Sequence, residues 1–301
     1  GRGEGASHAG CNVFLLPGVP KEMTVMFERS VLPSLRELGG GAVILSTTLH
    51  TFGLGESVIA EKLGDLMMRQ RNPSVGTTVS GGIVSLRVNA RFDSHAVAQR
   101  QLDATVASCR ETLGDLIFGQ DDQTLQFAVA ELLRKSKTTV TTAESCTGGL
   151  LAKMLTDVPG SSEYFKMGFI TYSNDAKYER LGVPTEILNL HGAVSEPVAQ
   201  AMAKNARRLA KADYALSVTG VAGPTGGSAA KPVGTVCIAL ASPSPGTPGE
   251  GGGEGARSNR EPQILVRTYH FPGDRDWVRD RSAKMALTML RYSLLGTPMP
   301  F

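Results

Sequence analysis

The sequence is most informative at the run Thr141-Thr142-Ala143-Glu144-Ser145-Cys146-Thr147-Gly148-Gly149. The β-branched residues 138–142 predict a strand, and two glycines then open a helix-like stretch over residues 150–155. A strand-to-helix turn of this kind can present a hydroxyl above free backbone N–H groups, which are what a developing oxyanion needs. Ser145 is therefore a candidate nucleophile. The alternative is that Ser145 has only a structural role, as a helix cap in a tight glycine turn.

Strands and helices alternate on both sides of this turn. Predicted strands cover residues 167–173, 214–218, 233–241 and 263–271, and predicted helices begin at Asp121 or Asp122, Asp175, Ser195 and Asp274. This alternation predicts a layered α/β/α domain over residues 120–301. Within it, residues 243–258 are nearly all Pro, Gly, Ser, Glu and Thr, and they predict a disordered insertion.

The sequence upstream predicts a small α+β domain over residues 41–119. Strand, helix, alternating strand and helix follow one another at 42–51, 56–69, 84–90 and 95–113, an order that fits a split βαβ arrangement. Residues 1–40 hold one strand–turn–helix unit, too small to bury a core alone. Because an apolar segment follows Gly1 so closely, we expect this unit to be the remnant of a longer domain, with its Pro17–Pro20 turn structural.

The composition narrows the classes of protein. A net charge of +3, spread along 301 residues, predicts no nucleic-acid-binding surface. No apolar run is long enough to span a membrane, and no signal peptide pattern is evident. The four cysteines and five histidines are dispersed without metal-ligand spacing. They predict reduced thiols in a cytoplasmic protein, and no metal site.

Several runs together carry a family resemblance. They are Ala143–Gly149, Val158–Ser162, Ile170–Lys177, His191–Glu196, Thr219–Pro224 and Lys231–Val236. In this order they resemble the CinA family, whose C-terminal domain is a nicotinamide-nucleotide amidohydrolase of pyridine-nucleotide salvage. That enzyme converts nicotinamide mononucleotide to nicotinate mononucleotide and ammonia. Upstream, Leu16–Met23 resembles the end of the family's molybdopterin-binding-like N-terminal domain, and Phe52–Ser57 resembles its KH-like middle domain.

The resemblance implies a serine amidase site without a metal or organic cofactor. It makes Ser145 the nucleophile and Lys177, assisted by Tyr172, the group that takes and returns the proton. A buried lysine can do so because desolvation lowers its pKa. If these two residues are only structural, Lys177 is a solvated lysine on a helix and Tyr172 is a half-buried aromatic residue on a strand. Cys146 is a rival nucleophile, because a thiol is intrinsically more reactive, but a small buried cysteine is the commoner case.

A further set of residues is expected to contact the substrate. The set is Thr147, Gly148, Gly149, Thr219, Gly220, Gly223 and Arg281. The first three are expected to hold the oxyanion through backbone N–H groups. The next three belong to a glycine-rich loop that can approach a phosphate closely, and the resemblance implies that they line the nucleotide site. The arginine is a candidate phosphate partner because of its charge and forked donors; otherwise it lies on a solvated helix face.

Two other functions stay open. One is pyrophosphate hydrolysis of ADP-ribose, which is associated with the family's N-terminal domain and would need an acidic metal cluster from the part missing here. The other is a non-enzymatic role as a nucleotide-binding competence or DNA-damage accessory. The expected partner in the main interpretation is a small-molecule nucleotide, nicotinamide mononucleotide, and the resemblance implies a homodimer.

Overall fold

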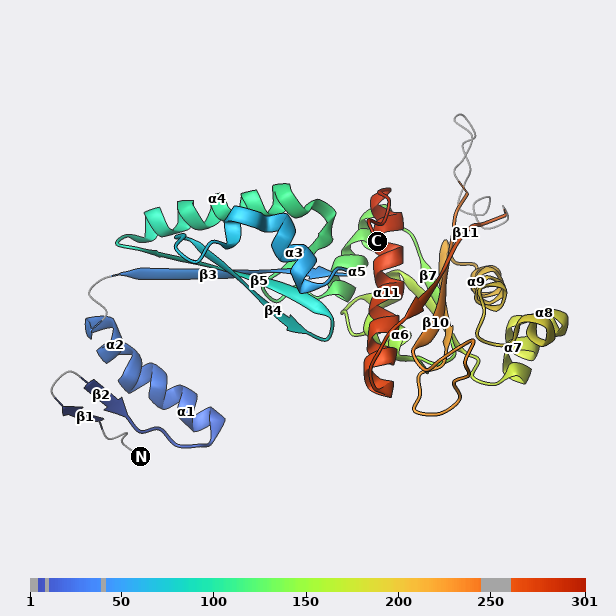
Figure 1. The fold of residues 1–301 in the computed structure, drawn as a ribbon, viewed down its shortest axis with the longest axis horizontal. Helices are drawn as coiled ribbons and strands as arrows, with labels where there is room; N and C mark the ends of the chain where they lie inside the picture. Colours follow the sequence, from blue (N-terminus) through green and yellow to red (C-terminus); the bar gives the residue numbers. More distant parts are fainter. Residues whose placement is uncertain (1–4, 9–10, 39–41, 245–260) are drawn as a thin grey trace. The chain divides into compact units, whose positions relative to one another are not determined.

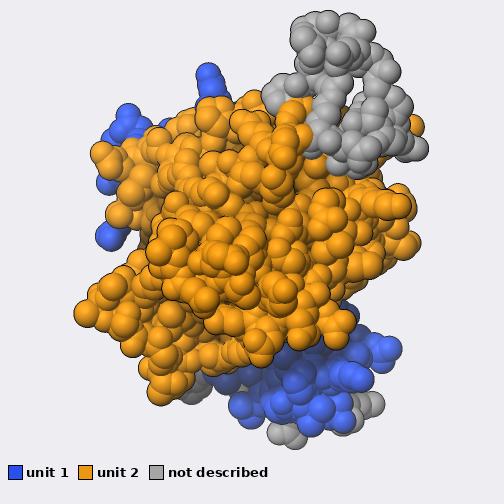
Figure 2. Space-filling model, turned by 90° about the vertical axis from the view of Figure 1, so that its right-hand side faces the viewer, with its two compact units in different colours: residues 1–47, 64–76, 87–111 blue, residues 48–63, 77–86, 112–301 orange. Residues whose placement is uncertain are grey.

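The computed structural model describes residues 5–8, 11–38, 42–244 and 261–301. The chain divides into two compact units, residues 1–47, 64–76 and 87–111, and residues 48–63, 77–86 and 112–301 (Figure 2). The insertion predicted at 243–258 lies almost wholly outside the described residues. Within the described ranges, no helix is both long enough and apolar enough to cross a membrane.

The first unit begins with a hairpin and an interrupted helix. β1 (Gly5–His8) pairs antiparallel with β2 (Cys11–Phe14). The helix predicted from residue 21 is present, as α1 (Pro20–Met26), a π-helical turn η1 (Phe27–Val31) and α2 (Leu32–Leu38). Pro20 suits the first helical position, because its fixed φ is already helical and its missing N–H would have no partner there.

A four-stranded sheet has the strand order β4-β5-β3-β6. Its strands are β3 (Val43–Phe52), β4 (Ser74–Ser80), β5 (Ile83–Phe92) and β6 (Ile117–Gln120). The connecting helices are α3 (Glu56–Leu63), η2 (Gly64–Met67), α4 (His95–Leu113) and η3 (Gly114–Leu116). The predicted order β-α-β-α therefore omitted two strands. Only Val75 is buried in β4, and β6 has four residues, so neither shows an apolar alternation.

The second unit contains a five-stranded sheet with the order β11-β10-β9-β7-β8. Its strands are β7 (Val140–Glu144), β8 (Phe165–Ile170), β9 (Tyr214–Gly220), β10 (Thr235–Ser242) and β11 (Gln263–His270). β7 is parallel to both β8 and β9, whereas β10 is antiparallel to β9 and β11. The carboxyl ends of β7, β8 and β9 therefore lie together at one edge of the sheet.

Helices cover both faces of this sheet (Figure 1). They are α5 (Leu125–Ser136), α6 (Leu150–Thr156), η4 (Ser161–Glu163), α7 (Asn174–Leu181), α8 (Thr185–His191), α9 (Glu196–Ala210) and α11 (Arg275–Leu295). Helices α5, α6 and α11 share one apolar core, and α7, α8 and α9 share the other. The layered α/β/α architecture preceded by a small α+β sheet, as predicted, is confirmed.

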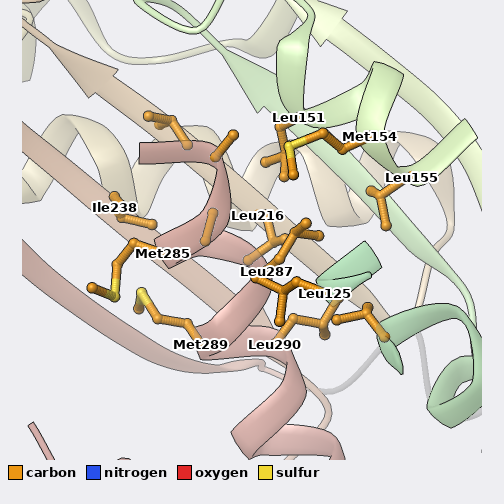
Figure 3. Close-up of a cluster of buried hydrophobic side chains, with 14 of the residues drawn as sticks. Leu125, Leu151, Met154, Leu155, Leu216, Ile238, Met285, Leu287, Met289 and Leu290 are labelled. Carbon is orange, nitrogen blue, oxygen red and sulfur yellow. The ribbon is translucent and has the colours of Figure 1, made fainter. Parts of the chain in front are cut away.

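The alternation of side chains along β9 separates the two cores. Leu216 packs with Leu151 of α6 and Leu287 of α11 (Figure 3). Its neighbour Ala215 belongs to the core beneath α9. Each fully buried leucine of this kind contributes roughly 1.5–3 kcal/mol to stability. These cores hold the strand ends, and the loops that follow them, in fixed positions.

The first helix of the layered domain starts later than predicted. Thr124 is the N-cap of α5, and its side chain accepts a hydrogen bond from the N–H of Phe127. The predicted cap at Asp121 or Asp122 is therefore wrong. The carboxylate of Asp121 instead accepts a hydrogen bond from the N–H of Thr48, at 2.9 Å.

Candidate active site

Three loops meet at the carboxyl edge of β7, β8 and β9. They begin at Ser145, Thr171 and Val221. The N–H of Ser145 donates to the carbonyl of Val218 at 2.9 Å, and the N–H of Thr171 donates to the carbonyl of Glu144 at 2.9 Å. Ligands of open α/β sheets bind outside the carboxyl ends of the strands. This edge is therefore the place where a site is expected.

The Glu144 carboxylate explains the shape of the first loop. It is fully buried and accepts hydrogen bonds from the N–H groups of Gly149 (2.9 Å), Leu151 (3.1 Å) and Ala152 (2.8 Å). These donors and the positive end of the α6 dipole offset the cost of burying its charge. Gly148 and Gly149 have φ of 58° and 95°, a region that glycine enters without strain. The cap thus fixes the residue beside it, Ser145.

Ser145 and Lys177 are directly paired. The Lys177 Nζ lies 3.1 Å from the Ser145 Oγ. It also lies 2.9 Å from the carbonyl oxygen of Thr171 and 3.3 Å from that of Tyr172. The lysine comes from the first turns of α7, a helix that Ser173 caps by accepting a hydrogen bond from the N–H of Ala176. The structure therefore brings together the serine and lysine that the sequence analysis singled out.

The surroundings of Lys177 favour its neutral form. Its side chain is 1% exposed, and within the described ranges it forms no ion pair. Burial lowers its pKa from the ordinary lysine value. A neutral amine has two N–H donors and one lone pair. The two carbonyls can take the donors, which leaves the lone pair for the hydroxyl proton of Ser145.

Tyr172 contributes two different contacts. Its main-chain carbonyl accepts from Lys177, but its phenolic oxygen accepts from Nη2 of Arg275 at 2.9 Å. The phenol is 58% exposed, because β8 ends at Ile170 and Tyr172 lies in the following loop instead of in the predicted strand. Nη1 of Arg275 donates to the carbonyl of Gly223 at 2.8 Å. The structure thus places the phenol on Arg275, and its role in proton transfer stays a prediction.

The thiol of Cys146 lies beside the nucleophile but is buried, with 4% exposure. Burial raises its pKa to about 12. A thiol with this pKa stays protonated near neutral pH, and the protonated form is a poor nucleophile. This environment supports the interpretation of Cys146 as a small core residue.

The loop leaves few free donors for an oxyanion. Gly148 donates to the Ser145 carbonyl at 3.1 Å, and Gly149 donates to Glu144. In the described part of the chain, the N–H groups of Cys146 and Thr147 have no oxygen acceptor, and both act on the Cys146 thiol to lower its pKa, against the larger effect of burial. The glycine N–H groups of the expected set 147–149 are therefore occupied, and the oxyanion role of the set stays a prediction. Thr147 also has a buried, unpartnered hydroxyl, and its carbonyl accepts from Nη2 of Arg279 at 2.9 Å.

The glycine-rich loop after β9 lies beside this turn, because β7 and β9 are neighbours. The hydroxyl of Thr219 donates to the carbonyl of Ala193 at 2.8 Å. A Cβ on Gly220 would lie 2.8 Å from the carbonyl oxygen of Thr235. Gly223 has a φ of 83°, and a Cβ there would lie 2.5 Å from Val233. Packing alone thus requires both glycines, and their contact with a nucleotide stays a prediction.

Arg281 lies elsewhere. Its guanidinium carbon is 5.7 Å from the ring centres of Phe52 and Phe271 and 5.5 Å from that of Trp277. The arginines of α11 that reach the loops at the sheet edge are Arg275 and Arg279. The structure therefore does not bring Arg281 to these loops, and its contact with a phosphate stays a prediction; the i, i+4 spacing of Arg275 and Arg279 was a signal that sequence reasoning did not use.

Over residues 5–8, 11–38, 42–244 and 261–301, there is no group of three or more His, Cys, Asp or Glu side chains placed to hold a metal ion. The site residues described above are Ser, Lys, Tyr, Thr and Arg, which offer hydroxyl and cationic groups.

Two family models match the chain one after the other. A sequence model of the CinA C-terminal domain matches residues 122–294, and one of the damage-inducible protein CinA KH domain matches residues 46–119. A putative competence-damage inducible protein from Symbiobacterium thermophilum is 46% identical over 94% of this chain. A CinA-like protein from Geobacter sulfurreducens is 42% identical over 96%. The chain spans only 65% and 66% of these two relatives.

Two solved structures of competence-damage proteins are similar to part of this chain. The competence/damage inducible protein CihA from Agrobacterium tumefaciens aligns with a TM-score of 0.50 and 38% identity, covering 57% of this chain and 93% of its own. A competence-damaged protein (CinA) superfamily member from Klebsiella pneumoniae aligns with a TM-score of 0.50 and 34% identity, covering 57% of this chain and 96% of its own.

Proposed function

Since the chain belongs to the CinA family, we propose that it is a nicotinamide-nucleotide amidohydrolase, which hydrolyses the carboxamide of nicotinamide mononucleotide. The products are nicotinate mononucleotide and ammonia. The observation that carries the proposal is the Ser145–Lys177 pair, a hydroxyl 3.1 Å from a buried amine whose pKa is lowered. Amide hydrolysis needs a nucleophile with a neighbouring base, and this pair supplies both.

In the proposed reaction, Ser145 Oγ attacks the carboxamide carbon while its proton passes to Lys177 Nζ. The oxyanion of the tetrahedral intermediate accepts hydrogen bonds from the N–H groups of Cys146 and Thr147. Lys177 then gives its proton to the departing nitrogen, which leaves as ammonia. Water attacks the resulting ester as Lys177 takes its proton, and nicotinate mononucleotide is released with Ser145 restored.

We assign the loop arginines to the anionic part of the substrate. Arg275 and Arg279 lie one helical turn apart on α11. Arg275 donates to the Gly223 carbonyl and the Tyr172 hydroxyl. Arg279 donates to the Thr147 carbonyl, and its Nη1 lies 3.6 Å from the exposed Asp276 carboxylate. Such anchoring leaves further donors on each fork for a phosphate. This assignment replaces Arg281 as the phosphate partner. The exposed phenol of Tyr172, fixed by Arg275, is assigned to orient the substrate at the mouth of the site.

The proposal is tested with purified protein, by measuring ammonia release from nicotinamide mononucleotide and, in parallel, AMP release from ADP-ribose with and without a divalent metal. Ammonia release without added metal supports the proposal. Metal-dependent AMP release without ammonia would support the pyrophosphatase, and tight nucleotide binding with no turnover would support the accessory role. The homodimer and the cytoplasmic location remain proposals, and sedimentation tests the first.

A further inference from the structure

A cavity lies on the side of α11 that carries Trp277 and Arg281. Its volume is about 780 Å³, within the range of roughly 300–1,000 Å³ that small-molecule sites occupy. Its lining includes Tyr269, Phe271, Trp277, Arg281 and Phe301. On a helix with about 100° between successive residues, positions 277 and 281 face away from positions 275 and 279. The cavity and the Ser145 loops therefore use different sides of the same helix.

Flat apolar surface dominates the cavity. The rings of Tyr269 and Phe271 are stacked, with centres 5.5 Å apart and an angle of 9° between their planes. The Trp277 ring lines the same space. The Tyr269 hydroxyl is buried without a hydrogen-bond partner in the described part of the chain, so the tyrosine presents its ring and not its hydroxyl to the cavity. Aromatic walls of this kind favour a planar ring as ligand.

Charged side chains line the cavity: Arg281, and Asp274 at the start of α11. Asp280 also lies near Arg281 and acts to raise its pKa, against the larger effect of burial. Arg281 contacts three aromatic rings, but within the described ranges its guanidinium has no hydrogen bond or ion pair. The adjacent carboxylate of Asp280 is taken by Lys284, at 2.7 Å. Burial lowers the pKa of Arg281 from its ordinary value, but an arginine stays charged at neutral pH. A guanidinium group whose N–H donors have no hydrogen-bond acceptor is suited to bind a carboxylate or a phosphate.

From these contacts we infer that the cavity is a second ligand site, for a planar aromatic molecule that carries an oxyanion, with a purine mononucleotide as the representative. The ring lies against Phe271 and Trp277, and the oxyanion binds Arg281. The inference does not depend on the amidohydrolase proposal, because no residue of the Ser145–Lys177 site lines this cavity.

Trp277 makes the site directly observable, because it is the single tryptophan of the sequence. We expect adenosine 5′-monophosphate to change the tryptophan fluorescence of the full chain in a saturable titration. Adenosine, which lacks the phosphate, is expected to bind about tenfold more weakly or worse, because the charge-assisted bonds are lost. The variant R281Q is expected to show a similar loss. The control is R208Q, which changes an exposed arginine on α9 and is expected to retain wild-type affinity. R279Q reports separately on binding at the Ser145 loops.

Three results would overturn the inference: no saturable fluorescence change, equal affinities for the nucleotide and the nucleoside, or equal affinities of wild type and R281Q. A loss in R279Q as large as in R281Q would assign the binding to the Ser145 loops and would also overturn it. If R281Q does not fold, R281K decides, because lysine keeps the charge over the rings but lacks the fork. R281K is expected to bind about threefold to tenfold more weakly than wild type.

Discussion

Arg275 and Tyr172 are hydrogen-bonded across 103 positions of sequence, with Nη2 of the arginine 2.9 Å from the phenolic oxygen. The other edge of the same guanidinium binds the carbonyl of Gly223. One side chain of α11 therefore connects the loop after β8, which provides the main-chain acceptors for Lys177, with the loop after β9. Because the shape of the site depends on these loops, the two residues are expected to act as a unit.

This coupling predicts non-additive effects in a double-mutant cycle. Y172F and R275K are each expected to lower kcat/KM for nicotinamide mononucleotide, and the double variant to fall little below the worse single variant. Residues in direct contact show interaction energies of about 0.5–3 kcal/mol. The steady-state kinetics of the four proteins measure this energy. If the loss of kcat/KM in the double variant equals the product of the two single losses, the hydrogen bond between these residues does not contribute to activity.

The lowered pKa of Lys177 predicts how activity depends on pH. Only the neutral amine can accept the Ser145 proton, so kcat/KM is expected to rise as pH increases through the pKa of Lys177. Because burial lowers that pKa, the midpoint of the rise is expected below 10.5, the ordinary value. K177R cannot become neutral and is expected to lose about a hundredfold to ten-thousandfold of activity. A rate that shows no rise at any pH below 10.5, or that falls as the pH increases towards 10.5, would contradict this role.

Glu144 is predicted to stabilise the domain by capping α6. E144Q removes the negative charge and turns one acceptor into a donor that faces backbone N–H groups. We expect a loss of about 2–4 kcal/mol in the free energy of unfolding, with a lower Tm. Thermal denaturation measures it. The control is E131Q on α5, whose side chain is 55% exposed and which is expected to unfold like wild type. Equal Tm values for E144Q and wild type would rule out the cap.

Cys146 is predicted to be chemically inert. With its pKa raised to about 12 by burial, the thiol is expected to resist alkylation by iodoacetamide at pH 8 in the folded protein and to react after denaturation. Peptide mass spectrometry distinguishes Cys146 from Cys109 and Cys237. Rapid labelling of Cys146 in the native protein would show that its surroundings are more open than the structure indicates.

Local patterns predicted the layered domain and singled out Ser145, whereas the family resemblance supplied Lys177 as its expected partner. The strand before Ser145 and the glycines after it are adjacent in sequence, and the family resemblance connected Ser145 to Lys177. The lowered pKa of that lysine could not be read from the sequence, because it depends on the burial of the amine in the folded domain. The cap made by Glu144 was equally hidden, since it depends on where its carboxylate points.

The sequence alone did not show which arginines of α11 reach the loops at the sheet edge. Arg275, Arg279 and Arg281 all lie on α11, and charge alone does not distinguish them. The difference arises from the direction each side chain takes around the helix, and that direction depends on the packing of Met285, Leu287 and Leu290 against the sheet (Figure 3). The strands β4 and β6 were missed for another reason: one buries a single residue and the other is too short to show a period.

The central claim is that Ser145 attacks the carboxamide after giving its proton to Lys177. The most direct measurement is the rate of ammonia release from nicotinamide mononucleotide by wild type, S145A and the adjacent control C146A. We predict that S145A loses about a thousandfold or more and that C146A stays within about threefold of wild type. Equal rates for wild type and S145A, or a loss in C146A that matches the loss in S145A, would contradict the claim.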